Sequence, residues 1–330
     1  MSDRTQKMQQ WLDSLGYQEY KLELASEDAS FRRYFRMKKG EESYVVMDAP
    51  PQKESCEAFV AVAKMLTDIR LSAPVILHAD LDQGFIMMTD FGDRHYLDEL
   101  KPETANALYG DAMSAIMQMQ TRINANDLPV YDEHLLRKEM NLFKEWFLEK
   151  LLGIELTANQ LGMWQMTTDY LVKNALEQPQ VFVHRDFHSR NLLRIKNRNP
   201  AILDFQDAVR GPVTYDLVSL LRDCYIDWPE PQVDQWILDF YDFASLEHVN
   251  GVSASQFIRW FNLMGVQRHL KAVGIFARLS IRDGKQKFLQ DIPRTLNYLK
   301  IVGTGEMSMV GLYTLMNELS LSFRVKSLIR

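Results

Sequence analysis

The sequence has little cysteine and no long hydrophobic run. Its two cysteines, Cys56 and Cys224, lie far apart among 330 residues, with no second Cys or His at metal-ligand spacing. Neither a disulfide framework nor a zinc site is therefore expected. No apolar run approaches the roughly 18 residues that a membrane span needs, and the N-terminal segment is typical of an amphipathic helix rather than a signal peptide. These absences predict a cytoplasmic protein with no membrane partner.

The sequence also lacks an excess of basic residues. Its formal net charge is -6, from 38 basic and 44 acidic residues whose signs are interspersed. A face that neutralises many nucleic-acid phosphates is therefore not expected. A hydrophobic content of 46% is ordinary for a globular chain that can bury two packed subdomains. We expect a small-molecule partner, no nucleic acid and no obligate protein partner, and the oligomeric state stays open.

Hydrophobic periodicity divides the chain into two parts. After an N-terminal helix with Gly16 just past its end, a β-rich part contains one helix over 54–68. Alternating patterns in this part predict strands over 31–37, 43–49, 75–78 and 85–89. Beyond Gly92 the period is mostly helical, over 103–122, 132–152, 157–177 and several segments after 214. The pattern predicts an α+β fold with a small lobe at 1–92 and a larger helical lobe at 93–330.

Residues able to carry phosphoryl transfer are concentrated between Val181 and Phe205, where three short apolar runs suggest short strands. There Asn191 follows Asp186 by five residues, and Asp204 follows thirteen residues later. Transfer of a phosphoryl group from a nucleotide needs a carboxylate for the proton of the acceptor hydroxyl, and oxygen ligands that hold magnesium. Asp204 alone is more often a turn residue. The three residues in this order indicate phosphoryl transfer.

The loop resembles a family signature. Its pattern is similar to the H-x-D-x-x-x-x-N motif of the aminoglycoside phosphotransferase and choline kinase branch of the kinase-like superfamily, in which an Asp on the next hairpin follows. The resemblance implies a protein-kinase-like two-lobe fold that uses ATP and Mg2+. It also implies that Asp186 is the catalytic base or orients the acceptor hydroxyl, and that Asn191 and Asp204 are magnesium ligands.

Several residues near this motif have plainer expected roles. Asp216 matches an Asp that, in the resembling branch, opens a helix and ties the catalytic loop down, but from the residue alone we expect it to cap its own helix. His184 and Arg185 are expected to brace the loop, with Asp216 as one candidate partner for a buried arginine. His188 could contact the acceptor, although an ordinary loop histidine is the preferred interpretation.

The expected nucleotide contacts begin at the segment that links the lobes. Asp90-Phe91-Gly92 spells the magnesium motif of protein kinases but precedes Asp186, so it does not take that role. Backbone groups near Met88 and Asp90 are instead expected to hold the edge of the adenine.

The sequence lacks the residues that usually contact the nucleotide phosphates in kinase-like enzymes. Kinase-like enzymes place a Lys or Arg on the third strand, but the run 44–48 has no basic residue. Arg32, Arg33 or else Lys53 could replace it, and a solvated strand face is an equal alternative for the arginines. The loop 26–30 also lacks glycine, so it would cover phosphates through backbone N–H groups and hydroxyls such as that of Ser30.

Three further segments, at 29–36, 47–51 and 267–271, resemble bacterial kinases that phosphorylate the anomeric hydroxyl of N-acetylmuramate and N-acetylglucosamine in cell-wall recycling. This resemblance implies an amino-sugar acceptor. The last segment contains Arg268, His269 and Lys271 within an apolar helix, for which a charged helix face is the default interpretation and an acceptor-binding wall is the alternative.

Other functions stay open from the residues alone. The acceptor could be another small hydroxylated molecule, such as an aminoglycoside, a choline-like amine or homoserine, although a basic late helix favours a neutral or anionic sugar. The missing third-strand lysine keeps a catalytically dead nucleotide-binding regulator as an alternative. The preference between ATP and GTP is not determined.

Overall fold

The computed structural model describes residues 3–27, 32–53 and 56–328. They form two compact units: the first comprises the described residues up to His95 together with Leu192–Asp207, and the second comprises Tyr96–Asn191 and the described residues from Ala208 onward. Within the described ranges, no helix is long and apolar enough to cross a bilayer. The assignment of 1–92 to the nucleotide and of 93–330 to the acceptor stays a prediction.

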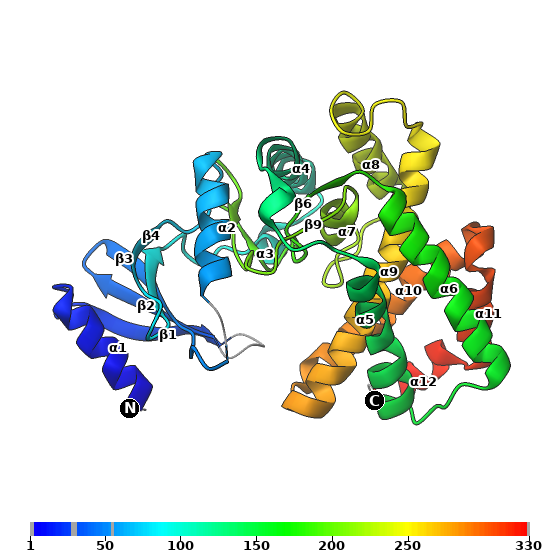
Figure 1. The fold of residues 1–330 in the computed structure, drawn as a ribbon, viewed down its shortest axis with the longest axis horizontal. Helices are drawn as coiled ribbons and strands as arrows, with labels where there is room; N and C mark the ends of the chain where they lie inside the picture. Colours follow the sequence, from blue (N-terminus) through cyan, green and yellow to red (C-terminus); the bar gives the residue numbers. More distant parts are fainter. Residues whose placement is uncertain (1–2, 28–31, 54–55, 329–330) are drawn as a thin grey trace. The chain divides into compact units, whose positions relative to one another are not determined.

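The first unit is built on a five-stranded antiparallel sheet in the order β1-β2-β3-β5-β4 (Figure 1). Its strands are β1 (Lys21–Glu27), β2 (Arg33–Lys39), β3 (Glu42–Asp48), β4 (Ile76–Asp80) and β5 (Phe85–Thr89). The four expected strands are confirmed, but β1 was not predicted, and the expected loop 26–30 begins inside it. β1 is an edge strand with an exposed Leu24, so its side chains give a weak burial signal.

Two helices and one small hairpin complete the first unit. Helix α1 (Asp3–Ser14) packs Met8 and Leu12 against apolar side chains of the sheet, including Val46. Helix α2 (Glu57–Asp68) buries one apolar face, as its period predicts. The hairpin of β7 (Leu192–Leu193) and β8 (Ala201–Ile202) carries Asp204 just beyond its second strand.

The second unit is mostly helical (Figure 1). Its α-helices are α3 (Tyr96–Glu99), α4 (Ala105–Arg122), α5 (Glu133–Leu142), α6 (Ala158–Glu177), α7 (Tyr215–Leu221), α8 (Glu230–Ala244), α9 (Ala254–Asp283), α10 (Ile292–Gly305), α11 (Val310–Glu318) and α12 (Leu321–Leu328). Shorter helical segments are η1 (Ala125–Asp127), the π-helical η2 (Phe143–Leu151), η3 (Gln286–Asp291) and η4 (Met307–Met309). The expected helices over 103–122, 132–152 and 157–177 are confirmed, and the middle one continues from α5 into η2.

The long helix α9 packs against most other helices of the second unit. Its first turn is capped by Ser253, whose side chain accepts a hydrogen bond from the amide of Gln256, and it ends at Gly284, which has a left-handed φ of 67°. A Cβ atom on Gly274 would lie 2.3 Å from the backbone carbon of Leu142 at the end of α5. Only glycine permits this approach, which packs α5 closely against α9.

A short antiparallel pair of strands in this unit, β6 (Gln180–Val183) and β9 (Val209–Pro212), leads into the loop that carries Asp186. β6 is fully buried except at its first residue, and the chain leaves it at His184. The loop of residues 184–191 is therefore anchored at its start by the core of the second unit.

Candidate active site

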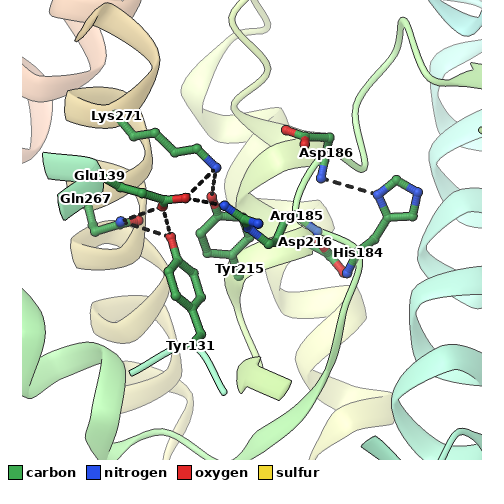
Figure 2. Close-up of polar contacts among 9 residues, drawn as sticks. All are labelled: Tyr131, Glu139, His184, Arg185, Asp186, Tyr215, Asp216, Gln267 and Lys271. Atoms are coloured by element: carbon green, nitrogen blue, oxygen red, sulfur yellow. Dashed lines mark hydrogen bonds and ion pairs between the residues drawn. The ribbon is translucent and has the colours of Figure 1, made fainter. Parts of the chain in front are cut away.

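The loop 184–191 is held by a carboxylate from helix α7. Asp216 is fully buried close to the loop (Figure 2), and its oxygens accept hydrogen bonds from the backbone N–H groups of His184, at 2.7 Å, and Arg185, at 3.0 Å. The α7 N-cap is Thr214, and Asp216 lies inside the first turn. The expectation that Asp216 caps its own helix is therefore wrong, because its carboxylate serves the loop. The tie implied by the family resemblance is confirmed.

This tie acts where the backbone of the loop is strained. Arg185 has a φ of 76°, in the left-handed region that side chains with a Cβ atom disfavour. Burial raises the pKa of Asp216 to about 7, and the two backbone hydrogen bonds only partly offset that effect. A carboxyl group that titrates near neutral pH thus supports the residue next to Asp186.

Two more interactions fix the rest of the loop. The buried Asp223 accepts from the amide of Ser189 at 2.9 Å and from its hydroxyl at 2.5 Å. The side-chain nitrogen of Asn191 donates to the backbone carbonyl of Asp186 at 3.0 Å. The amide of Asp186 donates to Nδ1 of His184 at 3.2 Å, so the expected bracing role of His184 is confirmed. The loop is preorganised around the Asp186 side chain.

Arg185 braces the loop with a partner that the sequence analysis did not identify. Its guanidinium pairs with Glu139 of α5 (Figure 2), and its backbone N–H donates to the Asp216 carboxylate. The observed ion-pair partner of Arg185 is therefore Glu139, whereas the candidate partner Asp216 holds the backbone of the same residue. A sequence signal for Glu139 was available, because it lies three residues after Leu136, on the helical face that is buried.

Arg268, His269 and Lys271 are all buried in α9, so the charged-face interpretation is wrong. Arg268 and Lys271 line a cavity of about 100 Å3 whose wall also contains Asp186. His269 does not line it: its Nε2 lies 2.9 Å from the carbonyl oxygen of Arg222, and its ring stacks on Tyr298. Burial lowers the pKa of His269 to about 3, so this ring is neutral.

The charges around the cavity keep Asp186 ionised. Burial by itself raises the pKa of Asp186, but Lys271, followed by His188, Arg185 and Arg268, outweighs this effect, and the pKa lies below its ordinary value. Asp186 is therefore a carboxylate throughout the neutral range. It can accept a hydrogen bond from a hydroxyl in the cavity.

His188 is a cavity-wall residue rather than an ordinary loop histidine. It lies on the same wall as Asp186, and its ring contacts the ring of Tyr225 edge-on. Its Nδ1 atom is buried and makes no hydrogen bond within the described part of the chain. Burial lowers the pKa of His188, against the charges of Asp223 and Asp186.

The expected nucleotide residues of the first unit have structural partners. Met88 is buried in β5. The carboxylate of Asp90 pairs with Arg36 at 2.7 Å and accepts from the Ser43 hydroxyl at 2.5 Å. The Asp90 side chain therefore fixes the end of β5 to β2 and β3. The predicted contact with the nucleotide uses backbone groups near Asp90 and stays a prediction.

The arginines expected to replace the missing lysine differ in environment. Arg33 pairs with the buried Asp48 of β3, which Arg4 of α1 also binds. Arg32 is 7% exposed, so a solvated strand face is wrong for this residue. Ser30 lies outside the described residues.

The two expected magnesium ligands belong to different units. Asp204 has a left-handed φ of 59°, and one of its carboxylate oxygens accepts from Gln206 at 2.8 Å. The hydrogen bond from the Asn191 nitrogen orients its amide, whose oxygen is the atom able to bind a cation. Within the described ranges, no group of three or more His, Cys, Asp or Glu residues could hold a metal by itself. Carboxylate and amide oxygens are each donor types that Mg2+ accepts, alongside the oxygens of water and phosphates.

Comparison with known proteins supports the same chemistry. A family model described as the phosphotransferase enzyme family matches residues 21–249. A Pseudomonas aeruginosa protein named N-acetylmuramate/N-acetylglucosamine kinase is 46% identical over 314 residues, which cover 91% of this chain and 93% of the relative. A Neisseria meningitidis serogroup B protein of the same name is 43% identical over 320 residues, which cover 95% of each chain.

Solved structures share the fold. An aminoglycoside phosphotransferase in ternary complex with streptomycin and ATP matches with a TM-score of 0.56 at 17% identity, over 85% of this chain and 95% of that one. The expected protein-kinase-like α+β fold is confirmed. Because the family model covers more than half of the chain and the two relatives match it over nearly their full length, this chain belongs to the phosphotransferase enzyme family.

Proposed function

We propose that this protein transfers the γ-phosphoryl group of ATP to the anomeric hydroxyl of N-acetylmuramate and of N-acetylglucosamine. The observation that carries the proposal is a cavity in which Asp186 faces buried cationic side chains, in a chain 46% identical to a kinase named for these two sugars. A product of this reaction would be a sugar 1-phosphate for cell-wall recycling in the cytoplasm.

The side chain of Asp186 has the properties that this reaction needs. Its lowered pKa keeps it ionised, so it can orient the acceptor hydroxyl and receive its proton as transfer proceeds. An anomeric hydroxyl is more acidic than an ordinary alcohol because the ring oxygen withdraws charge. A weakly basic carboxylate is therefore sufficient, and catalysis comes mainly from positioning and charge neutralisation.

The remaining site residues are assigned as follows. Mg2+ would be held by Asn191 and Asp204, and would neutralise charge on the phosphates when bound. The nucleotide would be held by backbone groups near Met88 and Asp90, and its phosphates by Ser30, Arg32 or Arg33.

In the acceptor site, Arg268 would bind the lactyl carboxylate of N-acetylmuramate, because its guanidinium lies in the cavity wall and, among the described residues, donates only to the sulfur of Cys224, at 3.7 Å. No carboxylate within the described ranges forms an ion pair with it. Lys271 lines the same wall, whereas His269 contacts Arg222 and Tyr298 instead of the cavity.

The position of the phosphate on the product tests this proposal. Phosphorus NMR of the reaction with each amino sugar and ATP should show a phosphate on the anomeric carbon. Phosphate on the 6-hydroxyl, or turnover only with an amine alcohol or an aminoglycoside, would contradict the proposed acceptor, whereas no ATP turnover with any acceptor would favour a nucleotide-binding regulator.

A further inference from the structure

We propose that Glu139 is a positioning residue of the phosphotransfer site, which holds Arg185 of the catalytic loop and Lys271 of the cavity wall in one buried ion cluster and so keeps Lys271 charged beside Asp186. The inference rests on the proposed transfer chemistry at Asp186. It gives Lys271 a role toward the loop rather than toward a particular acceptor.

The contacts of the cluster converge on one carboxylate, that of Glu139. Glu139 Oε1 lies 3.2 Å from the ammonium of Lys271 and pairs with the guanidinium of Arg185, while Oε2 accepts from the hydroxyl of Tyr131 (Figure 2). The ammonium of Lys271 also donates to the hydroxyl of Tyr215, at 3.1 Å. The side chains of Glu139, Lys271 and Arg185 are 7%, 10% and 15% exposed. The carboxylate of Glu139 therefore binds both cations.

The charge balance explains why Glu139 matters to Asp186. Arg185 precedes Asp186 in the loop, and Lys271 lines the cavity with it. With Glu139 ionised, its carboxylate offsets part of the positive charge that Lys271, Arg185 and Arg268 place around Asp186. Burial by itself raises the pKa of Glu139, but Lys271 and Arg185 outweigh it and lower the pKa, so that the balance holds at neutral pH. Without Glu139, Arg185 and Lys271 lose their shared carboxylate, and Asp186 faces these two cations and Arg268 without it, which is unfavourable.

If the Glu139 charge is removed, Lys271 is the cation that can lose its proton, because an arginine does not lose its proton in a protein. Burial lowers the pKa of Lys271, and Glu139 is the largest of the effects that oppose it and leave that pKa above its ordinary value. The charged and titratable groups that face Lys271 are Glu139 of α5, Tyr215 of α7, and Arg185 and Asp186 of the loop. Loss of the Glu139 charge should therefore let Lys271 lose its proton at lower pH, and with it the positive charge beside Asp186.

The experiment compares pH profiles of kcat with N-acetylglucosamine, which carries no carboxylate. Glu139→Gln should lower kcat near neutral pH about 10- to 100-fold, with less than about a twofold change in the KM for ATP. It should also introduce an alkaline loss of activity, between about pH 7 and 10, that the native protein does not have. Adding Lys271→Arg to Glu139→Gln should remove this alkaline loss, because arginine stays charged. Glu133→Gln, which removes an exposed carboxylate paired with Arg137 on the same helix, is the matched control and should change neither kcat nor the profile.

A second measurement separates this inference from the proposed function. NMR titration of the Lys271 ammonium requires no acceptor, and the inference expects a lower Lys271 pKa in Glu139→Gln than in the native protein. An unchanged Lys271 pKa, or an alkaline loss that persists with Lys271→Arg, would overturn the role of Glu139. Absence of turnover with both amino sugars in the native protein would instead overturn the proposed function. If Glu139→Gln does not fold, Lys271→Met tests the same cluster: the acidic limb of kcat/KM should move to higher pH, and an unmoved limb would overturn the inference.

Discussion

The carboxylate of Asp216 accepts a hydrogen bond from the backbone amide of Arg185, at 3.0 Å, at the residue whose φ is 76°. A buried acid therefore stabilises a strained position directly beside the proposed catalytic carboxylate. Since burial raises the pKa of Asp216 to about 7, this support is linked to pH.

This linkage gives the first prediction. An acid with a raised pKa in the folded state binds its proton more tightly when folded than when unfolded, so its contribution to stability falls as the pH rises from about 4 to about 7. Asp216→Asn does not titrate at this position. We expect the stability of the native protein relative to Asp216→Asn to decline over that pH range and to level off above it, as measured by chemical denaturation. A difference that does not change with pH would contradict a raised pKa.

The second prediction concerns the proposed base. Asp186→Asn should abolish turnover while magnesium and nucleotide still bind, because Asn191 and Asp204 remain. Steady-state kinetics and calorimetric titration with ATP and Mg2+ measure the two properties. Retention of more than a few per cent of native turnover would remove Asp186 from the role of base.

The third prediction concerns the proposed metal ligand. Asp204→Ala should weaken the binding of magnesium-nucleotide itself, because a carboxylate ligand is lost. Titration with ATP in the presence and absence of Mg2+ should show a smaller effect of the metal than in the native protein. Asp207→Ala, a nearby acid with no assigned role, is the control. An unchanged affinity in Asp204→Ala would displace this residue from the metal site.

The fourth prediction concerns acceptor specificity. Arg268→Gln should lower kcat/KM for N-acetylmuramate about 10- to 100-fold more than for N-acetylglucosamine, because only the former carries a carboxylate for the guanidinium to bind. Arg259→Gln on the same helix, which breaks a partly exposed ion pair with Glu306, should not discriminate. Equal losses for the two sugars would mean that Arg268 acts on Asp186 rather than on the acceptor.

The fifth prediction concerns packing that places Glu139. Gly274→Ala should lower the free energy of unfolding by about 1–3 kcal/mol, because its methyl group would overlap the backbone at Leu142 and push α5 away from α9. Gly265→Ala on the same helix is the matched control, since its methyl group would make an ordinary contact, 3.7 Å from Val218. Thermal unfolding of both variants, together with kcat, makes the comparison. Equal stability of the two would contradict a close approach at Gly274.

The sequence by itself determined the class of chemistry and most of the elements. Asp186, Asn191 and Asp204 have an order and spacing that few other functions use, and spacing is a local property of the chain. The four expected strands and the long helices were predictable because alternation and helical period report which side chains are buried. Strand β1 was not predicted, since an edge strand with exposed side chains has little of that pattern.

Only the tertiary structure decided which side chains pair. The charged segment 267–271 is compatible with an exposed face when α9 is considered alone, whereas in the structure it is buried and finds partners on α5 and α7. In the same way, Glu139 pairs with Arg185, 46 residues away, and Asp216 binds the loop instead of its own helix. The energy of a buried charge depends on groups brought together from distant parts of the chain, so a sequence that specifies each helix does not by itself state which charges neutralise each other.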